Sequence, residues 1–281
     1  MEVRPDALPG ESRWGYRKRR RRAAKAGRPP HPTPPTRMRL EDLTVVVPTK
    51  NEAANVGPFL ASLDARVALV VVDASVDDTR ARIAELRPDR TRVLEDPGNI
   101  PEARQLGLEA AETEWVLFTD ADMSFGADYW SAWERLSLRP RVGAVQGAKL
   151  SADGEFRLYY RVFSFGIRLA SWITLPAGSG SNMIFRRRAL LEAGGFDRAL
   201  TANEDIYALW SVRRAGWRVP FAGGLKVYER DHRRLRQGRA RKTLHGWIRP
   251  LMLFTGLGAG RVRKSSWGYW ADDEAPPDGR R

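Results

Sequence analysis

The chain has 281 residues, a length that suits one large α/β domain with tails or two small domains. Its formal net charge of +14 is concentrated in two segments: residues 1–39 carry 12 basic and 3 acidic side chains, and residues 233–264 carry 10 basic and no acidic ones. The rest of the chain is mildly acidic. This argues against nucleic acid as a partner, because a nucleic-acid-binding domain carries its positive charge on the folded core. The sequence has no cysteine, which excludes disulfides, thiolate metal sites and cysteine nucleophiles.

Residues 1–39 are rich in proline and arginine, and they contain too little apolar surface to offset the entropy of ordering. We therefore expect a disordered basic tail, which either tethers the protein to an anionic surface or has no specific role. No apolar segment of the signal-peptide type follows the first residues, and no run reaches the ~20 apolar residues of a membrane span. The sequence thus predicts a cytoplasmic protein.

Strands and helices alternate from residue 40 onward. Apolar runs of strand length are followed by segments of helical periodicity, which indicates right-handed βαβ units. The predicted fold class is therefore α/β, with a mostly parallel central sheet flanked by helices. We expect strands at residues 43–47, 67–72, 92–94 and 115–117, and helices at residues 53–63, at 79–86 and from Gly98 and Asn99 onward.

Two aspartates, Asp120 and Asp122, directly follow the strand at residues 115–117. Open α/β sheets place their ligands at the carboxyl ends of the strands. At about 5 Å and an effective dielectric constant of about 20, the two carboxylates repel each other by roughly 3 kcal/mol. A bound Mg²⁺ or Mn²⁺ removes this cost. By itself, however, the pattern is more often a pair of solvated turn residues.

Polar side chains also follow the two earlier strands of the sheet. Asn51 and Glu52 come after the first strand, and Asp73 ends the second. Because the carboxyl ends of parallel strands meet at one edge of a sheet, we expect these groups to lie near Asp120 and Asp122. Amide and carboxylate groups at such an edge suit the ribose, the base and the metal-bound diphosphate of a sugar nucleotide.

The order of these motifs resembles that of a family 2 glycosyltransferase with the GT-A fold. The resemblance covers about residues 43–227, and it is specific as a combination although each motif alone is common. The motifs are Val-Val-Pro-Thr-Lys-Asn-Glu at residues 46–52, Val-Val-Val-Asp-Ala-Ser-Val-Asp-Asp-Thr at 70–79, Ala-Arg-Gln-Leu-Gly-Leu at 103–108, Phe-Thr-Asp-Ala-Asp at 118–122, Gly-Ser-Asn-Met-Ile-Phe-Arg-Arg at 180–187, Gly-Gly-Phe-Asp at 194–197 and Asn-Glu-Asp at 203–205.

The resemblance implies that the protein moves a sugar from a nucleotide-diphosphate donor to an acceptor, which is a lipid, a glycan or a small molecule. Pro48 and Glu52 would contact the nucleoside, and Asp73 would face the base. Arg104 would lie near the nucleotide, and Asp120 would touch the ribose or the metal. The sequence does not identify the sugar or the acceptor.

The resemblance also assigns the metal and the chemistry. Asp122, with Asp120 beside it, would hold Mn²⁺ or Mg²⁺, and Asp205 would be the catalytic base with Glu204 as its neighbour. Without the resemblance, Glu204 and Asp205 would be better explained as acids at a helix start. Since a late-loop histidine completes the metal shell in several GT-A enzymes, His232 is a further candidate ligand; an ordinary surface histidine is the alternative.

Two features depart from the family pattern or refine it. Ala74 stands where the family often has glycine in the turn after the second strand. The Gln-x-x-Arg-Trp motif of processive synthases is absent, and residues 213–217 read Arg-Arg-Ala-Gly-Trp instead. We therefore expect single sugar additions, with inversion at the anomeric carbon.

The sequence beyond Asp122 predicts a helix at residues 130–138, a strand at 142–150 and a helix at 156–172. For the last helix we favour packing against the core with its arginines in solvent. Contact of its aromatic side chains with a lipid-linked acceptor is the alternative. Residues 175–181 form a glycine-containing loop that allows the backbone to approach a ligand.

Residues 239–254 have the spacing of a basic amphipathic helix. Such a helix either lies on an anionic membrane surface, which would make the protein peripheral, or packs on the domain. The expected organisation is a tail at residues 1–39, a glycosyltransferase domain at 40–232, a basic helical segment at 233–264 and a loose end at 265–281. Two other functions remain open: a nucleotidyltransferase, or a membrane- or nucleic-acid-binding protein that acts through its basic flanks.

Overall fold

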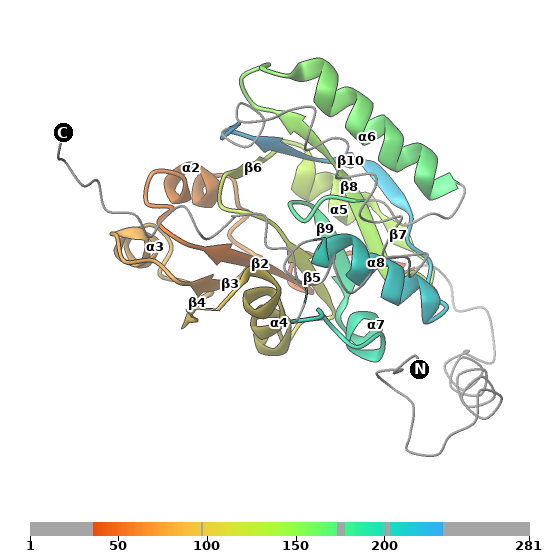
Figure 1. The fold of residues 1–281 in the computed structure, drawn as a ribbon, viewed down its shortest axis with the longest axis horizontal. Coiled ribbons are helices and arrows are strands. Elements are labelled where there is room, and N and C mark those ends of the chain that lie inside the picture. Colours follow the sequence, from red (N-terminus) through yellow and green to blue (C-terminus); the bar gives the residue numbers. More distant parts are fainter. Residues whose placement is uncertain (1–35, 97, 173–177, 199, 201–202, 233–281) are drawn as a thin grey trace, which may run out of the picture.

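The computed structural model describes residues 36–96, 98–172, 178–198, 200 and 203–232. An eight-stranded sheet in the order β4-β3-β2-β5-β9-β8-β10-β6 runs through this part of the chain, with helices on both faces (Figure 1). The strands are β1 (Thr36–Arg37), β2 (Leu43–Thr49), β3 (Ala68–Asp73), β4 (Thr91–Glu95), β5 (Trp115–Phe118), β6 (Met123–Phe125), β7 (Ser137–Leu138), β8 (Ala144–Ser151), β9 (Met183–Arg186) and β10 (Phe221–Glu229). The helices are α2 (Val56–Ala61), α3 (Thr79–Leu86), α4 (Ile100–Ala110), α5 (Tyr129–Arg135), α6 (Arg157–Trp172), α7 (Arg187–Glu192) and α8 (Glu204–Arg214).

The first half of the sheet is parallel. β4, β3, β2 and β5 run in one direction, so the chain segments that follow them emerge at the same edge. β9 is antiparallel to both β5 and β8, β10 is parallel to β8, and β6 closes the other end as an antiparallel edge strand. The prediction of an α/β fold with a mostly parallel central sheet is confirmed.

Two apolar layers hold the helices against the sheet. Because successive residues of a strand point to opposite faces, Val45 and Val47 pack on one layer while Val46 packs on the other. The first layer joins the sheet to α2, α3 and α5 through residues such as Phe59 and Trp133. The second layer joins it to α4, α7 and α8 and fixes the helices that carry the candidate site.

The predicted strands and helices of the first half are present, with shifted ends. The helix expected from residue 53 begins at Val56, and the helix expected to reach residue 138 ends at Arg135. The latter prediction is wrong at its end because Leu136 turns to an extended backbone, after which Ser137 and Leu138 pair with β1. The helix expected from Gly98 and Asn99 onward begins at Ile100, and Asn99 caps it, since its side chain accepts a hydrogen bond from the N–H of Glu102. Asn203 occupies the N-cap position of α8, but its side chain makes no capping hydrogen bond.

The packing interpretation of α6 requires a correction. One face of the helix is buried through Tyr160, Ile167 and Ala170, as the core-packing interpretation requires. The opposite face, however, exposes large apolar side chains and not only arginines. The exposed apolar residues of α6 are Leu158, Val162, Phe165, Leu169 and Trp172.

The tail at residues 1–35, the basic segment at 233–264 and the end at 265–281 lie outside the described residues, so the domain boundaries and the expected helix at 239–254 stay predictions. Among the helices that the structure describes, none combines the length and the apolar character that crossing a bilayer requires.

The close approach of α4 to the sheet gives a test of the packing. A Cβ atom on Gly107 would lie 2.2 Å from Cγ1 of Val46, whereas a Cβ on Gly57 in α2 would have its nearest neighbour 3.9 Å away. We expect Gly107→Ala to lower the free energy of unfolding by about 1–3 kcal/mol through overpacking. Gly57→Ala, the matched control, should change it by less than about 1 kcal/mol, because the gain in helix propensity is opposed by the restriction on a residue before Pro58. Urea unfolding of the two variants measures both changes, and a neutral Gly107→Ala would contradict the packing described.

Candidate active site

The candidate site is built at the carboxyl ends of β2, β3 and β5. Asp73, the last residue of β3, is buried, and its Oδ1 accepts hydrogen bonds from the hydroxyls of Thr49 and Ser75, each at 2.6 Å. Its Oδ2 accepts the N–H of Ser75 at 3.1 Å and lies 3.4 Å from the guanidinium of Arg80. The Asp73 carboxylate is therefore held in one orientation at the strand end.

Pro48 and Glu52 lie beside Asp73. Pro48 is in register with Val72 of the neighbouring strand. The loop after β2 is tied to the start of α3, because the N–H of Glu52 donates to Oγ1 of Thr79 at 2.9 Å. The Glu52 carboxylate accepts a hydrogen bond from Asn55 at 2.6 Å. The residues predicted to contact the nucleoside and the base thus share one edge of the sheet.

A buried arginine joins the aspartate after β5 to the start of α8. The side chain of Arg104 is only 3% exposed; its Nη2 lies 3.0 Å from Oδ1 of Asp120, and its Nη1 lies 2.5 Å from Oε1 of Glu204. Nη2 also donates to the carbonyl of Gly180 at 3.3 Å. Arg104 therefore contacts two other predicted site residues directly, one of them, Glu204, 100 positions away in the sequence.

Asp205 completes this cluster from the first turn of α8. Its Oδ2 accepts the N–H of Gly180 at 2.8 Å, and its Oδ1 accepts the N–H of Ile206 at 2.7 Å. The glycine is needed here, because a Cβ on Gly180 would lie 2.6 Å from Nη2 of Arg104. The loop glycine predicted to let the backbone approach a ligand therefore lets it approach Arg104.

Burial changes the protonation of the two acids on α8. Desolvation raises the pKa of Glu204 to about 7, and Arg104 partly offsets this shift. Desolvation also raises the pKa of Asp205, again against the attraction of Arg104. Burial favours the neutral form of Arg104, but Glu204, Asp120 and Asp205 keep its pKa above the ordinary value. A carboxylate that accepts a proton near neutral pH has the property required of a general base.

A partly buried lysine that the sequence analysis missed lies on the other side of Asp120. The Nζ of Lys149 is 3.0 Å from Oε2 of Glu229 and 3.2 Å from Oγ of Ser181, whose hydroxyl donates to Oδ2 of Asp120 at 2.6 Å. Burial opposes its charge, yet Glu229 first, and then Asp122 and Asp120, raise the pKa of Lys149. The sequence did contain an indication, since Lys149 is the one charged residue in an otherwise uncharged strand, β8.

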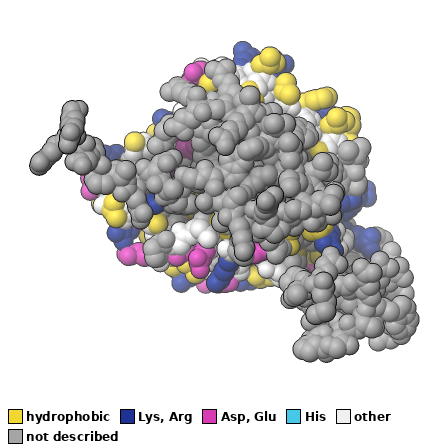
Figure 2. Space-filling view, in the orientation of Figure 1, with side chains coloured by type: hydrophobic (Ala, Val, Ile, Leu, Met, Phe, Trp, Pro, Cys, Tyr) yellow, Lys and Arg dark blue, Asp and Glu magenta, His cyan; other side chains and the backbone are white. Residues whose placement is uncertain are grey.

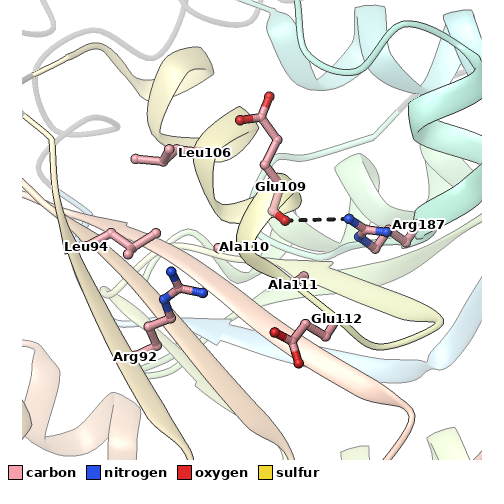
Figure 3. Close-up of a pocket in the computed structure, with 8 residues that line it drawn as sticks. All are labelled: Arg92, Leu94, Leu106, Glu109, Ala110, Ala111, Glu112 and Arg187. Carbon is pink, nitrogen blue, oxygen red and sulfur yellow. Dashed lines mark hydrogen bonds between the residues drawn. The ribbon is translucent and has the colours of Figure 1, made fainter.

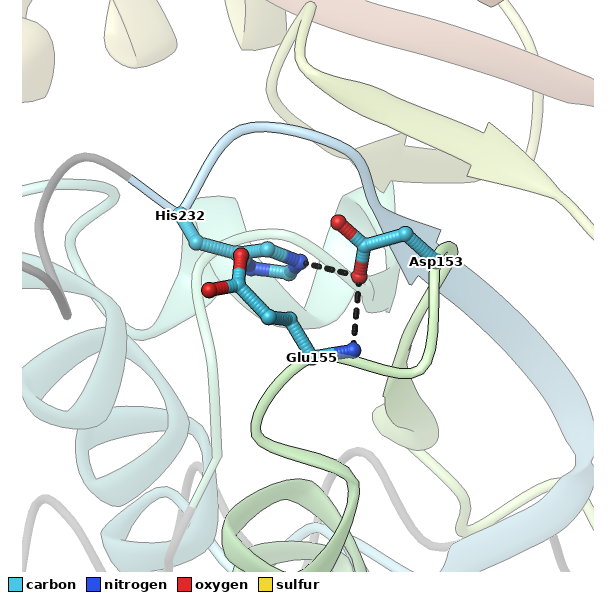
Figure 4. Close-up of side chains that lie close together, drawn as sticks. All are labelled: Asp153, Glu155 and His232. Carbon is cyan, nitrogen blue, oxygen red and sulfur yellow. Dashed lines mark hydrogen bonds and ion pairs between the residues drawn. The ribbon is translucent and has the colours of Figure 1, made fainter.

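His232 is held by a network next to the site. The ring is buried; its Nδ1 is 3.0 Å from the hydroxyl of Tyr160, and its Nε2 is 3.0 Å from Asp153 and 3.2 Å from the hydroxyl of Ser151. Figure 4 shows the imidazole directed at the Asp153 carboxylate, with Glu155 beside it. Hydrogen bonds from Ser151, from the N–H of Glu155 and from His232 lower the pKa of Asp153 to about 2.

These contacts place His232 in a different group of acids from the one predicted. Asp153, Glu155 and His232 each offer one potential ligand atom, and these atoms lie within 4.8 Å of one another. The aspartate after β5 that was expected to share a metal with His232 is Asp122, whose backbone carbonyl accepts the N–H of Arg230 at 3.0 Å. The role of His232 as a ligand of the Asp122 metal stays a prediction.

A cavity of about 540 Å³ lies away from these residues, between α4, β4 and the start of α7 (Figure 3). Its lining combines apolar residues such as Leu94 and Leu106 with charged ones such as Arg92 and Glu112. Figure 3 shows Arg187 donating to the backbone carbonyl of Glu109 across it. None of the predicted site residues lines this cavity, so its size does not identify it as the active site.

Comparison with known proteins identifies the family of the chain. The family model "Glycosyl transferase family 2" matches residues 44–194, more than half of the chain. The chain belongs to this family. The match includes β2 to β9 and all the candidate residues except those on α8 and after β10.

Two kinds of relatives extend the comparison. The pre-mycofactocin glycosyltransferase of Mycobacterium tuberculosis is 27% identical over 233 residues, which are 77% of this chain and 48% of that protein. The chain thus spans about half the length of the curated relative that it matches. The mannosyltransferase PcManGT from Pyrobaculum calidifontis, solved with GDP-Man and Mn²⁺, is 27% identical with a TM-score of 0.62, covering 89% of this chain and 72% of its own. S. aureus TarS 1-349, solved with UDP-GlcNAc, is 20% identical with a TM-score of 0.52 over 67% of this chain and 58% of its own, and shares the GT-A fold.

The raised pKa of Glu204 predicts a pH dependence of stability. An acid whose pKa is about 7 in the folded protein and 4.5 in the unfolded chain binds more protons when folded, so its contribution is largest below pH 4.5 and is lost as the pH rises toward 7. We expect Glu204→Gln to reduce the fall in the free energy of unfolding between pH 5 and pH 8 by on the order of 2 kcal/mol. Urea unfolding of the wild-type protein and the variant at both pH values measures this change in the free energy of unfolding. Parallel pH curves for the two proteins would show that the Glu204 carboxyl is not shifted.

Proposed function

We propose that this protein is a metal-dependent glycosyltransferase that moves a sugar from a nucleoside-diphosphate donor to an acceptor hydroxyl. The observation that carries the proposal is the contact of Arg104 with both Asp120 and Glu204, with Asp205 bound to the backbone of Gly180 in the same cluster. These residues come from α4, from the segment after β5 and from α8, and the resemblance of the motifs to the family implies the same positions for the reaction centre.

The donor site is proposed at the ends of β2 and β3. Asp73 would face the base there; its carboxylate is fixed by Thr49, Ser75 and Arg80 and has no exposed surface in this structure, and Pro48 and Glu52 follow on the neighbouring strand and its loop to contact the nucleoside. The presence of GDP-Man in the similar mannosyltransferase supports a nucleoside-diphosphate sugar as the donor class. The base and the sugar of the donor stay open between GDP-mannose and other sugar nucleotides.

The residues after β5 fit a divalent cation. The oxygens of Asp120 already contact Arg104 and Ser181, so Asp122 would be the principal carboxylate ligand with Asp120 beside it. Carboxylate oxygens with substrate phosphates are the usual ligands of Mg²⁺ and Mn²⁺, and the similar mannosyltransferase was solved with Mn²⁺. A cation held there would stabilise the charge that builds on the departing diphosphate.

The chain's own residues supply the remaining chemistry. Asp205 accepts the proton of the acceptor hydroxyl, the acceptor oxygen bonds to the anomeric carbon, and the bond from that carbon to the diphosphate oxygen breaks. Attack from the side opposite the leaving group inverts the anomeric carbon. Arg104 contacts one oxygen of Asp120, and Lys149 reaches the other through Ser181. Their positive charges compensate the negative charge that the reaction brings to this part of the site. The absence of the processive motif supports single additions.

Two carboxamide variants test the assigned roles. We expect Asp122→Asn and Asp205→Asn each to lower the turnover number by about 10²–10⁴-fold, because a ligand or a base is lost while the shape is kept. Asp128→Asn, at the exposed start of α5, is the matched control and should retain turnover. The turnover number is measured as the rate at which nucleotide is released from each member of a panel of sugar nucleotides. Release by hydrolysis, with water as the acceptor, is included. Near-normal turnover of a correctly folded variant would refute the role of that residue.

Donor binding gives a test that does not require the acceptor. A ligand that binds only the folded protein raises the unfolding temperature by mass action. We expect at least one nucleotide sugar to raise the unfolding temperature in the presence of Mn²⁺, with a smaller increase without the ion or in Asp122→Asn.

Release of pyrophosphate instead of a nucleoside phosphate during turnover would overturn the proposal in favour of nucleotidyl transfer.

A further inference from the structure

The apolar side chains that the described residues expose gather on one helix. Nine large hydrophobic residues are exposed in the described part of the chain, and five of them lie on α6. They are spaced four, three, four and three residues apart, so they form a single stripe along the helix. Figure 2 shows the corresponding hydrophobic surface along the upper right edge of the molecule, where Figure 1 places α6. We call this set the α6 stripe; it consists of Leu158, Val162, Phe165, Leu169 and Trp172.

Positive charge lies along one flank of the α6 stripe. Arg157, Arg161 and Arg168 are exposed, and α6 contains no acidic residue. A groove of about 670 Å³ runs between the helix and the strands β8 and β10, with Arg161, Arg168 and Lys226 as its charged lining residues. Its apolar lining is Ala148, Leu150, Leu158, Val162, Phe165 and Phe221. Apolar surface with cations at its border suits an amphiphile with a negatively charged head.

The charges decide between the possible occupants of this surface. The chain's own residues 233–264 carry 10 basic and no acidic side chains, so packing them here would bring like charges together. A second copy of α6 would oppose arginines with arginines. Anionic lipid offers the complementary charge for the arginines and an apolar layer for the stripe. We propose that the α6 stripe, with its flanking arginines, docks the protein on the surface of an anionic membrane.

This surface is connected to the candidate site through β8. Ala148 and Leu150 line the groove, while Lys149, between them, contacts Glu229 and Ser181 beside Asp120. Docking through α6 therefore brings the site close to the lipid surface. The inference goes beyond the proposed function, because membrane docking would stand even if the transfer reaction were assigned wrongly. It also differs from the membrane hypothesis for residues 239–254, since it depends on α6 alone.

A single fluorescent label can locate the contact, because the sequence has no cysteine. Val162, which is 62% exposed on the α6 stripe, is replaced in the full chain by cysteine and labelled with a nitrobenzoxadiazole dye. Val76, which is 92% exposed at the start of the α3 region, receives the same change as the control. With vesicles of phosphatidylcholine and phosphatidylglycerol we expect a blue shift and a several-fold brightening of the Val162→Cys label and no change at Val76→Cys. Vesicles of phosphatidylcholine alone should produce no response.

Substitutions in the full chain test the two components of the surface. We expect Phe165→Ser with Trp172→Ser, and separately Arg161→Gln with Arg168→Gln, each to lower the partitioning into anionic vesicles about tenfold. Leu86→Ser with Leu191→Ser removes exposed apolar side chains elsewhere and should leave it unchanged. Unfolding temperatures of the variants confirm that the fold is kept.

Three results would overturn the proposal. Vesicle binding with no change of the Val162→Cys label, or with full affinity in both double variants, would show that the basic flanks bind the membrane without α6. A blue-shifted label in the absence of vesicles that does not depend on protein concentration would show that residues 233–264 cover the stripe. A shift that grows with protein concentration would identify a second copy of the chain as the occupant.

Discussion

The candidate site depends on one buried charge, the guanidinium of Arg104. Removing such a group from water costs several kcal/mol unless it is paired, and the loss of one partner of a buried pair typically costs about 3–5 kcal/mol. Asp120 and Glu204 supply that pairing from two separate elements, and the backbone of Gly180 accepts a further hydrogen bond. The position of α8 relative to β5 is therefore set by charge compensation as well as by apolar packing. Two of the candidate site acids are thus also the ion-pair partners of the arginine.

This pairing also explains the unequal states of the acids. Asp120 is close to two cations, Arg104 directly and Lys149 through Ser181. Glu204 and Asp205 share the attraction of one arginine, and desolvation prevails and raises the pKa of both. Asp120 thus suits an interaction with a cation or a ribose, and the α8 acids suit proton transfer. The number of nearby positive charges therefore distinguishes Asp120 from the two acids on α8.

The sequence predicted those parts of the fold and site that depend on local patterns. Apolar runs that end in Asp73 and Asp120 marked the strand ends, and parallel pairing then required these residues to share an edge. Contacts between distant segments had no local pattern. The network of Lys149, Glu229 and Tyr160 joins β8, β10 and α6, and only the folded chain brings it together. For the same reason the predicted end of α5 was too late: the pairing of Ser137 with the distant Arg37, which follows the end of the helix, had no local pattern.

The exposure of α6 could not be read from its sequence, because apolar residues occupy more than one face of the helix. Tyr160 and Ile167 are buried while Phe165 and Trp172 are exposed, although all four are large and apolar. Only the position of β8 and β10 determines which face is covered. The buried face then carries Tyr160, whose hydroxyl donates to Glu229 and contacts His232. Glu229 in turn contacts Lys149, and Lys149 reaches Asp120 through Ser181, so a chain of polar contacts joins the buried face of α6 to the site.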